Sequence, residues 1–288
     1  MPPVTLLRAR FVLPIVRPPI ENGAVAVAGG RLLAVGSWSE VRRGTSGAVV
    51  DLGDSVLLPG LVNAHCHLEY TELAGKIHPP RNFVEWIEAI VARKAQMALD
   101  DFRRSWQQGA AMLLRSGTTT VADIAAFPEL LPDAWSGTPL RVISFRELIL
   151  LKSGPPATHA VRTAIQEMKT WPKVKGRIGL SPHAPYTTTA ELLRQAARAA
   201  RVNHWRLVTH VAESEPEFEM FMYRQGPLYD WLKNQRDMAD CGQGSPVQHL
   251  ARCGYLSHRL LAVHANYLGL GDAATLGRQH VSVVHCPR

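Results

Sequence analysis

Short apolar runs alternate with longer amphipathic stretches along most of the chain, from about residue 55 onward. Seven apolar runs rich in β-branched residues predict strands, at 56–67, 118–124, 140–148, 177–183, 206–213, 260–267 and 281–285. The stretches between them predict helices, at 82–99, 102–115, 128–135, 157–170, 189–200, 215–233, 246–253 and 272–279. Strands that alternate with helices indicate a parallel sheet whose strands are joined by right-handed crossovers.

The first 56 residues have a different pattern, in which short β-type runs are separated by turn residues. The runs lie at 5–13, 23–27, 31–35 and 48–52. The Gly29-Gly30 pair is typical of a hairpin turn. This pattern predicts a small antiparallel β unit of the β-sandwich type. We therefore expect two domains, a β unit at 1–56 and a barrel at 57–288.

The barrel that this alternation predicts is incomplete. A closed (β/α)8 TIM barrel has eight parallel strands and about 250 residues. Only seven strands are predicted here, and the sequence ends directly after the seventh. We therefore expect an α/β fold of the TIM-barrel type that lacks one βα unit and has open edges at its first and seventh strands.

Composition excludes several other classes of protein. Of the 288 residues, 46% are hydrophobic and 19% charged, so the chain can bury a core and is not of the disordered class. No apolar run of about 18 residues is present, and we expect no membrane partner. Arg8, Arg10 and Pro14 interrupt the N-terminal apolar segment, which argues against a secretory signal. Four scattered cysteines without a CxxC pair favour a reducing, cytoplasmic location.

The net charge of +8 raises the question of a nucleic-acid partner. The basic residues are spread along helical segments such as 192–206, and no nucleic-acid-binding motif accompanies them. A solvated helix surface explains this charge better than a phosphate-binding surface does. We expect no nucleic-acid partner.

Histidine positions carry the chemical signal. The chain has 12 histidines, and five of the seven predicted strands end in one or two of them: His65 and His67, His183, His210, His264 and His285. The carboxyl ends of parallel strands form the rim at which ligands bind in α/β folds. The pattern therefore predicts a metal site or a catalytic centre at this rim.

Two spacings make the prediction more specific. His65 and His67 are two positions apart on a strand, so both side chains project from the same face, as two zinc ligands would. A buried core pair gives the same spacing, so the pair alone does not decide. His210 and Glu213 form an HxxE at the end of another strand, which suits a metal ligand beside a proton-transfer carboxylate. The alternative for Glu213 is a place near a helix start, where Ser214 and Glu217 already form a capping box.

Six segments follow one another along the predicted strands: LLPGLVNAHCH at 57–67, SGTTTVAD at 116–123, SPHAPYT at 181–187, THVAES at 209–214, LLAVHANYL at 260–268 and VVHCPR at 283–288. Taken together, these segments resemble the amidohydrolase superfamily. The chain looks most like its aminohydrolase and chlorohydrolase branch, which includes 5′-methylthioadenosine/S-adenosylhomocysteine deaminases, aminodeoxyfutalosine deaminase and guanine deaminase. The order of the segments along consecutive strands makes coincidence an unsatisfactory explanation.

The resemblance implies a single divalent metal held by His65, His67 and His210. Zinc is the first choice and iron the alternative, because imidazole suits both. It also implies two catalytic residues. Glu213 would protonate a ring nitrogen of the substrate, and His264 would hold and help activate the metal-bound water.

The resemblance further implies substrate-binding residues and a reaction. His183 would contact the substrate or its leaving group, and Glu85, in the segment FVEW at 83–86, would meet a ribose hydroxyl. Arg146 and its neighbour Glu147, at the end of the third barrel strand, are weaker candidates. The implied reaction is hydrolytic deamination of a purine-like heterocyclic amine by metal-bound hydroxide, with an adenosine derivative as the leading substrate.

Alternatives to this reaction stay open. A chlorohydrolase or another amidine hydrolase of the same branch would carry the same residues. The family also places an Asp after an eighth strand, and this sequence contains no such strand. The chain is therefore either a fragment of a longer enzyme or a natural truncation, which could be an inactive, metal-binding barrel with a structural partner role. Its oligomeric state is open, with a homodimer as an ordinary assembly for such a scaffold.

Overall fold

The computed structural model describes residues 2–152, 156–172 and 177–287. The chain divides into two compact units, Met1–Leu61 and Val62–Arg288, which are described separately. No helix within the described residues is long and apolar enough to cross a membrane.

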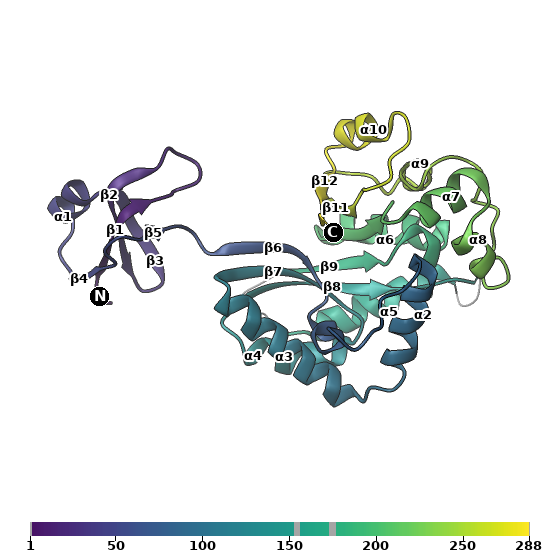
Figure 1. The fold of residues 1–288 in the computed structure, drawn as a ribbon, viewed down its shortest axis with the longest axis horizontal. Helices are drawn as coiled ribbons and strands as arrows, with labels where there is room; N and C mark the ends of the chain where they lie inside the picture. The colour runs from purple at the N-terminus through teal and green to yellow at the C-terminus, as the bar shows by residue number, and fades with distance from the viewer. Residues whose placement is uncertain (1, 153–155, 173–176, 288) are drawn as a thin grey trace. The chain divides into compact units, whose positions relative to one another are not determined.

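The first unit is a five-stranded sheet with one short helix (Figure 1). Its elements are β1 (Thr5–Val12), β2 (Ile20–Ala28), β3 (Arg31–Ser37), α1 (Trp38–Gly44), β4 (Ala48–Asp51) and β5 (Val56–Leu57). The expected separate β unit is present, but its strands are not all antiparallel. Strands β1, β2 and β3 form an antiparallel meander, whereas β4 and β5 both pair with β1 in parallel.

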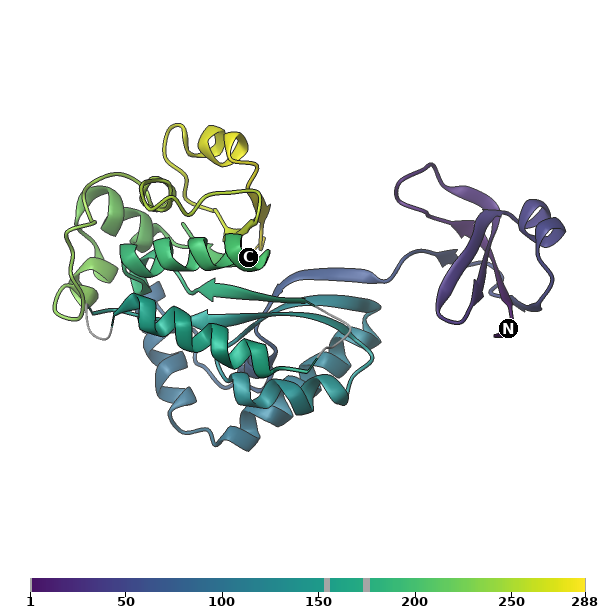
Figure 2. The same ribbon diagram turned by 180° about the vertical axis from the view of Figure 1, so that it is seen from behind.

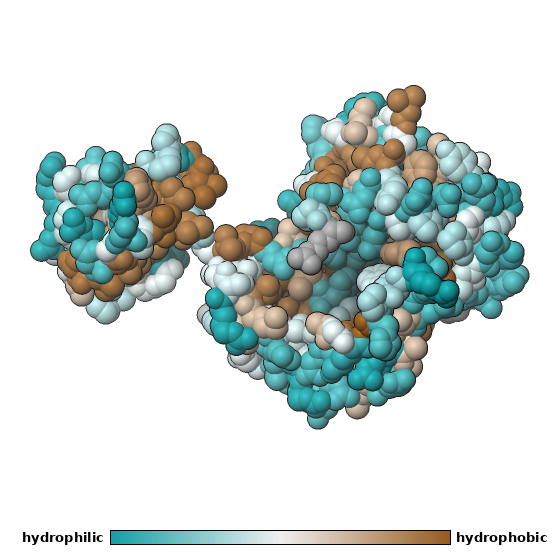
Figure 3. All heavy atoms as spheres, viewed as in Figure 1, coloured by the Kyte–Doolittle hydropathy of each residue, from teal (hydrophilic) through white to brown (hydrophobic). Residues whose placement is uncertain are grey.

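Helix α1 was not expected from the sequence, and it explains how β4 can run parallel to β1. The helix begins at Ser37, whose side chain forms a capping box with Glu40, and it carries the chain back to the starting edge of the sheet. Val41 of this helix packs on Leu6 and Ala26 in the small core of the unit. Hydrophobic side chains also remain exposed on this unit, and Figure 3 shows such residues gathered on its surface.

The second unit contains a seven-stranded sheet in the order β12-β11-β10-β9-β8-β7-β6. Its strands are β6 (Leu61–Cys66), β7 (Thr118–Ala125), β8 (Arg141–Leu148), β9 (Arg177–Pro182), β10 (Arg206–Val211), β11 (Leu260–His264) and β12 (Ser282–Val284). Every pair whose register is described, from β7 to β12, is parallel. Among the described residues no pairing joins β6 to β12, so the sheet is a barrel that is not closed.

Helices connect successive strands, as the alternation predicted. They are η1 (Leu68–Leu73), α2 (Phe83–Lys94), α3 (Leu99–Arg115), η2 (Pro128–Leu130), α4 (Leu131–Ser136), α5 (Ala157–Thr170), η3 (Pro185–Thr187), α6 (Ala190–Asn203), α7 (Glu215–Tyr223), α8 (Pro227–Leu232), α9 (Pro246–Arg252) and α10 (Asp272–Arg278). Figure 2 shows α5 and α6 side by side across the outer face of β8 and β9, in agreement with their contacts.

Two predicted elements are interrupted. The strand expected at 56–67 is divided around Pro59, since Val56 and Leu57 pair with β1 and the chain resumes as β6. The helix expected at 215–233 is divided into α7 and α8. Gly226, between them, has φ +92°, a backbone conformation that favours glycine.

Successive side chains along each barrel strand point to opposite faces of the sheet, and the two faces form separate hydrophobic cores. On the outer face, residues such as Leu207 and Ala262 pack against α6 and its neighbours. On the inner face, Ile124, Phe145 and Val263 come from different strands and contact one another. The barrel interior is therefore filled by side chains, and the polar residues at the carboxyl ends of the strands stand above a packed floor.

Candidate metal and catalytic site

Five imidazoles converge at the carboxyl ends of the parallel sheet. His65 and His67 come from the end of β6, His183 follows β9, His210 lies in β10 and His264 ends β11. The ring centroids of His65, His67 and His210 are 5.0–5.2 Å from one another. His264 lies 5.6 Å from both His65 and His210, and His183 lies 4.7 Å from His210. Five of the six strand-end histidines singled out in the sequence thus lie together, and the sixth, His285, has no described ring contact with them.

The ring nitrogens are close enough to share one cation. Nitrogens of His65, His210 and His264 lie within 4.8 Å of one another. The Nε2 atoms of His67 and His210 are 3.1 Å apart. Two nitrogens that each lie about 2.0–2.1 Å from a tetrahedral zinc ion are about 3.3 Å apart. His210 belongs to both groupings and is therefore the central residue of the set.

Hydrogen bonds orient the central ring. The Nδ1 atom of His210 donates to the backbone oxygen of His183 at 2.8 Å, so in the neutral ring Nε2 carries a free lone pair. The Nδ1 atoms of His65 and His67 are buried and have no hydrogen-bond partner among the described residues. Buried imidazoles with free nitrogens are the chemical form in which histidine binds zinc or iron.

Burial also keeps these rings unprotonated. Desolvation lowers the pKa of His65 to about 4 and holds the pKa values of His67 and His210 well below the ordinary value, and neighbouring imidazoles lower them further. Desolvation lowers the pKa of His264 to about 4, with a smaller effect from His285. Because metal binding requires deprotonated ligands, this donor set fits a divalent cation.

Glu213 lies beside His264. Its Oε1 atom is 3.3 Å from His264 Nε2, and burial raises the pKa of this carboxyl to about 7. A carboxyl with a pKa near neutrality can both hold and release a proton, as a general acid or base must.

The loops after β10 and β11 hold Glu213 in place. Ala212 has φ +51°, which turns the chain sharply after the strand. The Glu213 backbone N–H donates to Glu217 at 2.9 Å, and the Asn266 side-chain amide donates to the Glu213 backbone oxygen at 3.0 Å. Asn266 also donates its backbone N–H to the Ala212 oxygen at 2.9 Å. The two loops are therefore tied together where Glu213 meets His264.

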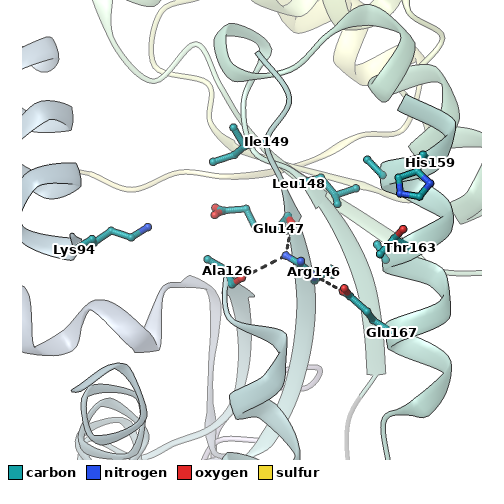
Figure 4. A pocket seen from close by; sticks show the side chains of 11 residues that line it. Lys94, Ala126, Arg146, Glu147, Leu148, Ile149, His159, Thr163 and Glu167 are labelled. Atoms are coloured by element: carbon teal, nitrogen blue, oxygen red, sulfur yellow. Dashed lines mark hydrogen bonds and ion pairs between the residues drawn. The ribbon is translucent and has the colours of Figure 1, made fainter. Parts of the chain in front are cut away.

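The three predicted substrate-binding residues have different surroundings. His183 lies within the imidazole cluster, and its Nδ1 atom is 2.7 Å from the Thr187 hydroxyl. Glu85, in the first turn of α2, forms an ion pair with Arg81. Arg146 points away from the barrel interior and pairs with Glu167 of α5 at 3.1 Å (Figure 4). Only His183 of the three has a contact with the cluster among the described interactions.

Two residues near the cluster, Glu69 and Tyr70, were not singled out in the sequence. The Tyr70 ring stacks on His67, with centroids 5.2 Å apart and planes 6° from parallel. Glu69 is buried, accepts the Ala126 backbone N–H and has a pKa raised by burial to about 8. Both residues follow the HxH segment directly, in the sequence HLEY, so their nearness to the strand-end histidines was available as a signal.

An α/β barrel with clustered imidazoles and a carboxylate at the carboxyl ends of its strands has the architecture of a TIM-barrel hydrolase. A model described as the amidohydrolase family matches residues 56–288. The chain belongs to the amidohydrolase family, which confirms the resemblance drawn from its sequence.

Individual relatives are deaminases by name. A 5-methylthioadenosine/S-adenosylhomocysteine deaminase of Syntrophobacter fumaroxidans is 30% identical over 276 residues, which cover 93% of this chain and 58% of the relative. An aminodeoxyfutalosine deaminase of Deinococcus radiodurans is 29% identical over 277 residues, which cover 92% of this chain and 65% of the relative. The chain thus spans about three-fifths of the length of the curated relatives that it matches.

Solved structures show the same fold. The Helicobacter pylori aminofutalosine deaminase in complex with methylthio-coformycin superposes with a TM-score of 0.84 at 20% identity, over 98% of this chain and 70% of the other. A zinc-bound adenosine deaminase of Xanthomonas campestris superposes with a TM-score of 0.76 at 23% identity, over 98% of this chain and 62% of the other. These likenesses confirm the α/β barrel of the TIM type predicted from the sequence.

Proposed function

We propose that this chain carries the active site of a metal-dependent aminohydrolase that deaminates a purine-like amine, with an adenosine derivative as substrate. The observation that carries the proposal is the convergence of His65, His67, His210 and His264 with the buried carboxyl of Glu213. The names of the relatives agree with this chemistry, since they act on methylthioadenosine, S-adenosylhomocysteine or aminodeoxyfutalosine.

The metal would be held by His65, His67 and His210. Zinc is the preferred metal, and iron is the alternative. The nitrogens of His65, His210 and His264 form a second possible set, in which His264 replaces His67. A divalent cation in either set would supply Lewis acidity and lower the pKa of water toward about 7.

Glu213 would deliver a proton to the ring nitrogen next to the amine-bearing carbon. The pKa of about 7 lets its carboxyl carry that proton at neutral pH, and the contact with His264 fixes the position of Oε1. His264 would orient the attacking water. Its pKa of about 4 keeps the ring neutral, so that one nitrogen can accept a hydrogen bond.

His183 would contact the substrate beside the leaving amine. Its pKa is lowered by burial, so the neutral ring can accept a hydrogen bond from an amino group. Glu85 and Arg146 would lie farther along the substrate, Glu85 toward a ribose and Arg146 toward a distal substituent. Both would have to exchange their present ion-pair partners for the substrate.

Ammonia release from the zinc-loaded chain tests the proposal. We expect turnover of adenosine, 5′-deoxyadenosine or methylthioadenosine, and no turnover after the metal is removed by a chelator. Chloride release from a chlorinated triazine without ammonia release would instead identify a chlorohydrolase. Tight zinc binding without release of either product would reject the enzymatic proposal and favour an inactive, metal-binding barrel.

A further inference from the structure

A cavity of about 470 Å³ opens at the carboxyl ends of β7 and β8, next to α5 (Figure 4). Its polar lining residues are Lys94, Arg146, Glu147, His159, Thr163 and Glu167. Because all described pairs of the barrel sheet are parallel, the cavity lies at the same end of the sheet as the imidazole cluster.

Glu147 is the unusual residue of this cavity. It continues the inward-facing series of β8 after Phe145, and the residue is only 7% exposed. Figure 4 shows its carboxylate pointing into the cavity, whereas Arg146 turns to the other side and is held by Glu167. The Glu147 side chain has no hydrogen bond or ion pair with any residue that the structure describes.

The body of the Glu147 side chain is buried, and its carboxylate reaches solvent only through the cavity, where no described residue donates a hydrogen bond to it. A ligand in the cavity can supply the donor that this carboxylate lacks. Glu147 is also near the proposed chemistry. Its charge raises the pKa of His183, although burial has the larger, opposite effect.

Lys94 faces Glu147 across the cavity (Figure 4). Its ammonium group contacts the Tyr70 hydroxyl and lies 4.5 Å from the Tyr70 ring centroid. No ion pair joins Lys94 to Glu147 among the described residues, so the space between the two opposite charges can take a ligand group. An anionic group there would be repelled by Glu147, and a cationic group by Lys94. A hydroxyl satisfies both residues, because it donates to a carboxylate and accepts from an ammonium.

We infer that Glu147 accepts a hydrogen bond from a sugar hydroxyl of the substrate and thereby selects nucleosides that carry this hydroxyl over their deoxy analogues. Lys94 donates to the oxygen of the same hydroxyl. This inference rests on the proposed deaminase function and adds a specificity-determining residue to it. It predicts that the sugar extends from the imidazole cluster into the cavity beside β8.

The test compares adenosine with 2′-, 3′- and 5′-deoxyadenosine, using the zinc-loaded chain and its Glu147→Ala variant. Wild type should prefer adenosine over one of the deoxy analogues by about 10- to 100-fold in kcat/KM, as expected for a hydrogen bond to a charged group. Glu147→Ala should abolish that preference while it leaves the rate with the same deoxy analogue within about threefold. An equal loss on all four substrates would show a structural role and overturn the inference, as would an unchanged preference.

Glu129→Ala is the matched control, because Glu129 is an exposed carboxylate in η2, near the carboxyl end of β7. It should keep the wild-type preference among the four nucleosides. If wild type releases ammonia from none of them, the proposed function fails. Calorimetry then tests the inference separately: wild type should bind adenosine more tightly than one deoxy analogue, and Glu147→Ala should lose this difference in affinity. Failure of wild type to bind adenosine, or equal binding of all four nucleosides, would then overturn it.

Discussion

The carboxylate of Asp123 accepts the backbone N–H of Leu68 at 2.9 Å, although the two residues are 55 positions apart in the chain. Leu68 directly follows His67, so this bond fixes the turn that leaves β6. The second oxygen of Asp123 accepts the indole N–H of Trp106 at 2.8 Å, which ties the same carboxylate to α3. Asp123 therefore acts through the backbone on the position of His67.

Removal of the Asp123 carboxylate should weaken both the fold and the metal site. Asp123→Ala leaves two buried donors without a partner, and we expect a loss of about 2–5 kcal/mol in the free energy of unfolding. Zinc affinity should fall about tenfold or more, because the support of a ligand is lost. Urea unfolding and a zinc-competition assay measure the two effects. Asp133→Ala, at an exposed position of α4, should change the free energy of unfolding by less than about 0.5 kcal/mol.

The proposed roles of His210 and Glu213 are separable by two substitutions. His210→Ala removes the ring shared by both sets of close nitrogens and should strip the zinc, as measured by elemental analysis after dialysis. Glu213→Gln should keep the zinc and lower kcat by about 100- to 10,000-fold, because the amide cannot carry the proton. Equal zinc content in wild type and His210→Ala would rule out His210 as a ligand.

The order of the strands and the meeting of the histidines were predictable from the sequence. Parallel strands place their carboxyl ends at one rim, so His183 and His264 had to approach the HxH pair if the alternation was interpreted correctly. The inward direction of Glu147 also followed from its place two residues after Phe145. The same alternation turns Arg146 toward α5.

Contacts that depend on positive φ angles or on distant partners were not predictable. The backbone of Ala212 and of His264 is left-handed, with φ +51° and φ +78°, and no local rule assigns this conformation to alanine or histidine. The contact of Glu213 with His264 depends on these turns. Helix α1 is a different case, because the Ser37 and Glu40 capping signal was present but the stretch lacked a clear apolar period.

Glu217 should make stability depend on pH. Its side chain is buried, and desolvation raises its pKa from 4.5 to about 8. The folded state therefore binds the proton of Glu217 more tightly than the unfolded state does. The contribution of this proton to the free energy of unfolding is fully present below pH 4.5 and is lost as the pH rises toward 8. Glu217→Gln keeps an oxygen for the Glu213 N–H and cannot ionise. The variant should therefore gain stability relative to wild type across this interval in urea unfolding, whereas parallel curves would show that Glu217 does not titrate there.

Gly109 should be intolerant of a side chain, although it lies in the middle of helix α3. Alanine in place of glycine inside a helix ordinarily adds about 1 kcal/mol of stability. A Cβ atom at Gly109 would overlap the Thr71 hydroxyl and lie 3.0 Å from Leu68 Cδ2, in the segment that follows His67. We expect Gly109→Ala to lower the free energy of unfolding by about 1–3 kcal/mol, because overpacking outweighs the gain in helix propensity. Gly277→Ala in α10 is the matched control, since a Cβ there meets no atom within 4 Å and should stabilise by up to about 1 kcal/mol. Equal stabilisation by both substitutions in thermal and urea unfolding would contradict the close packing of α3 against the turn that follows His67.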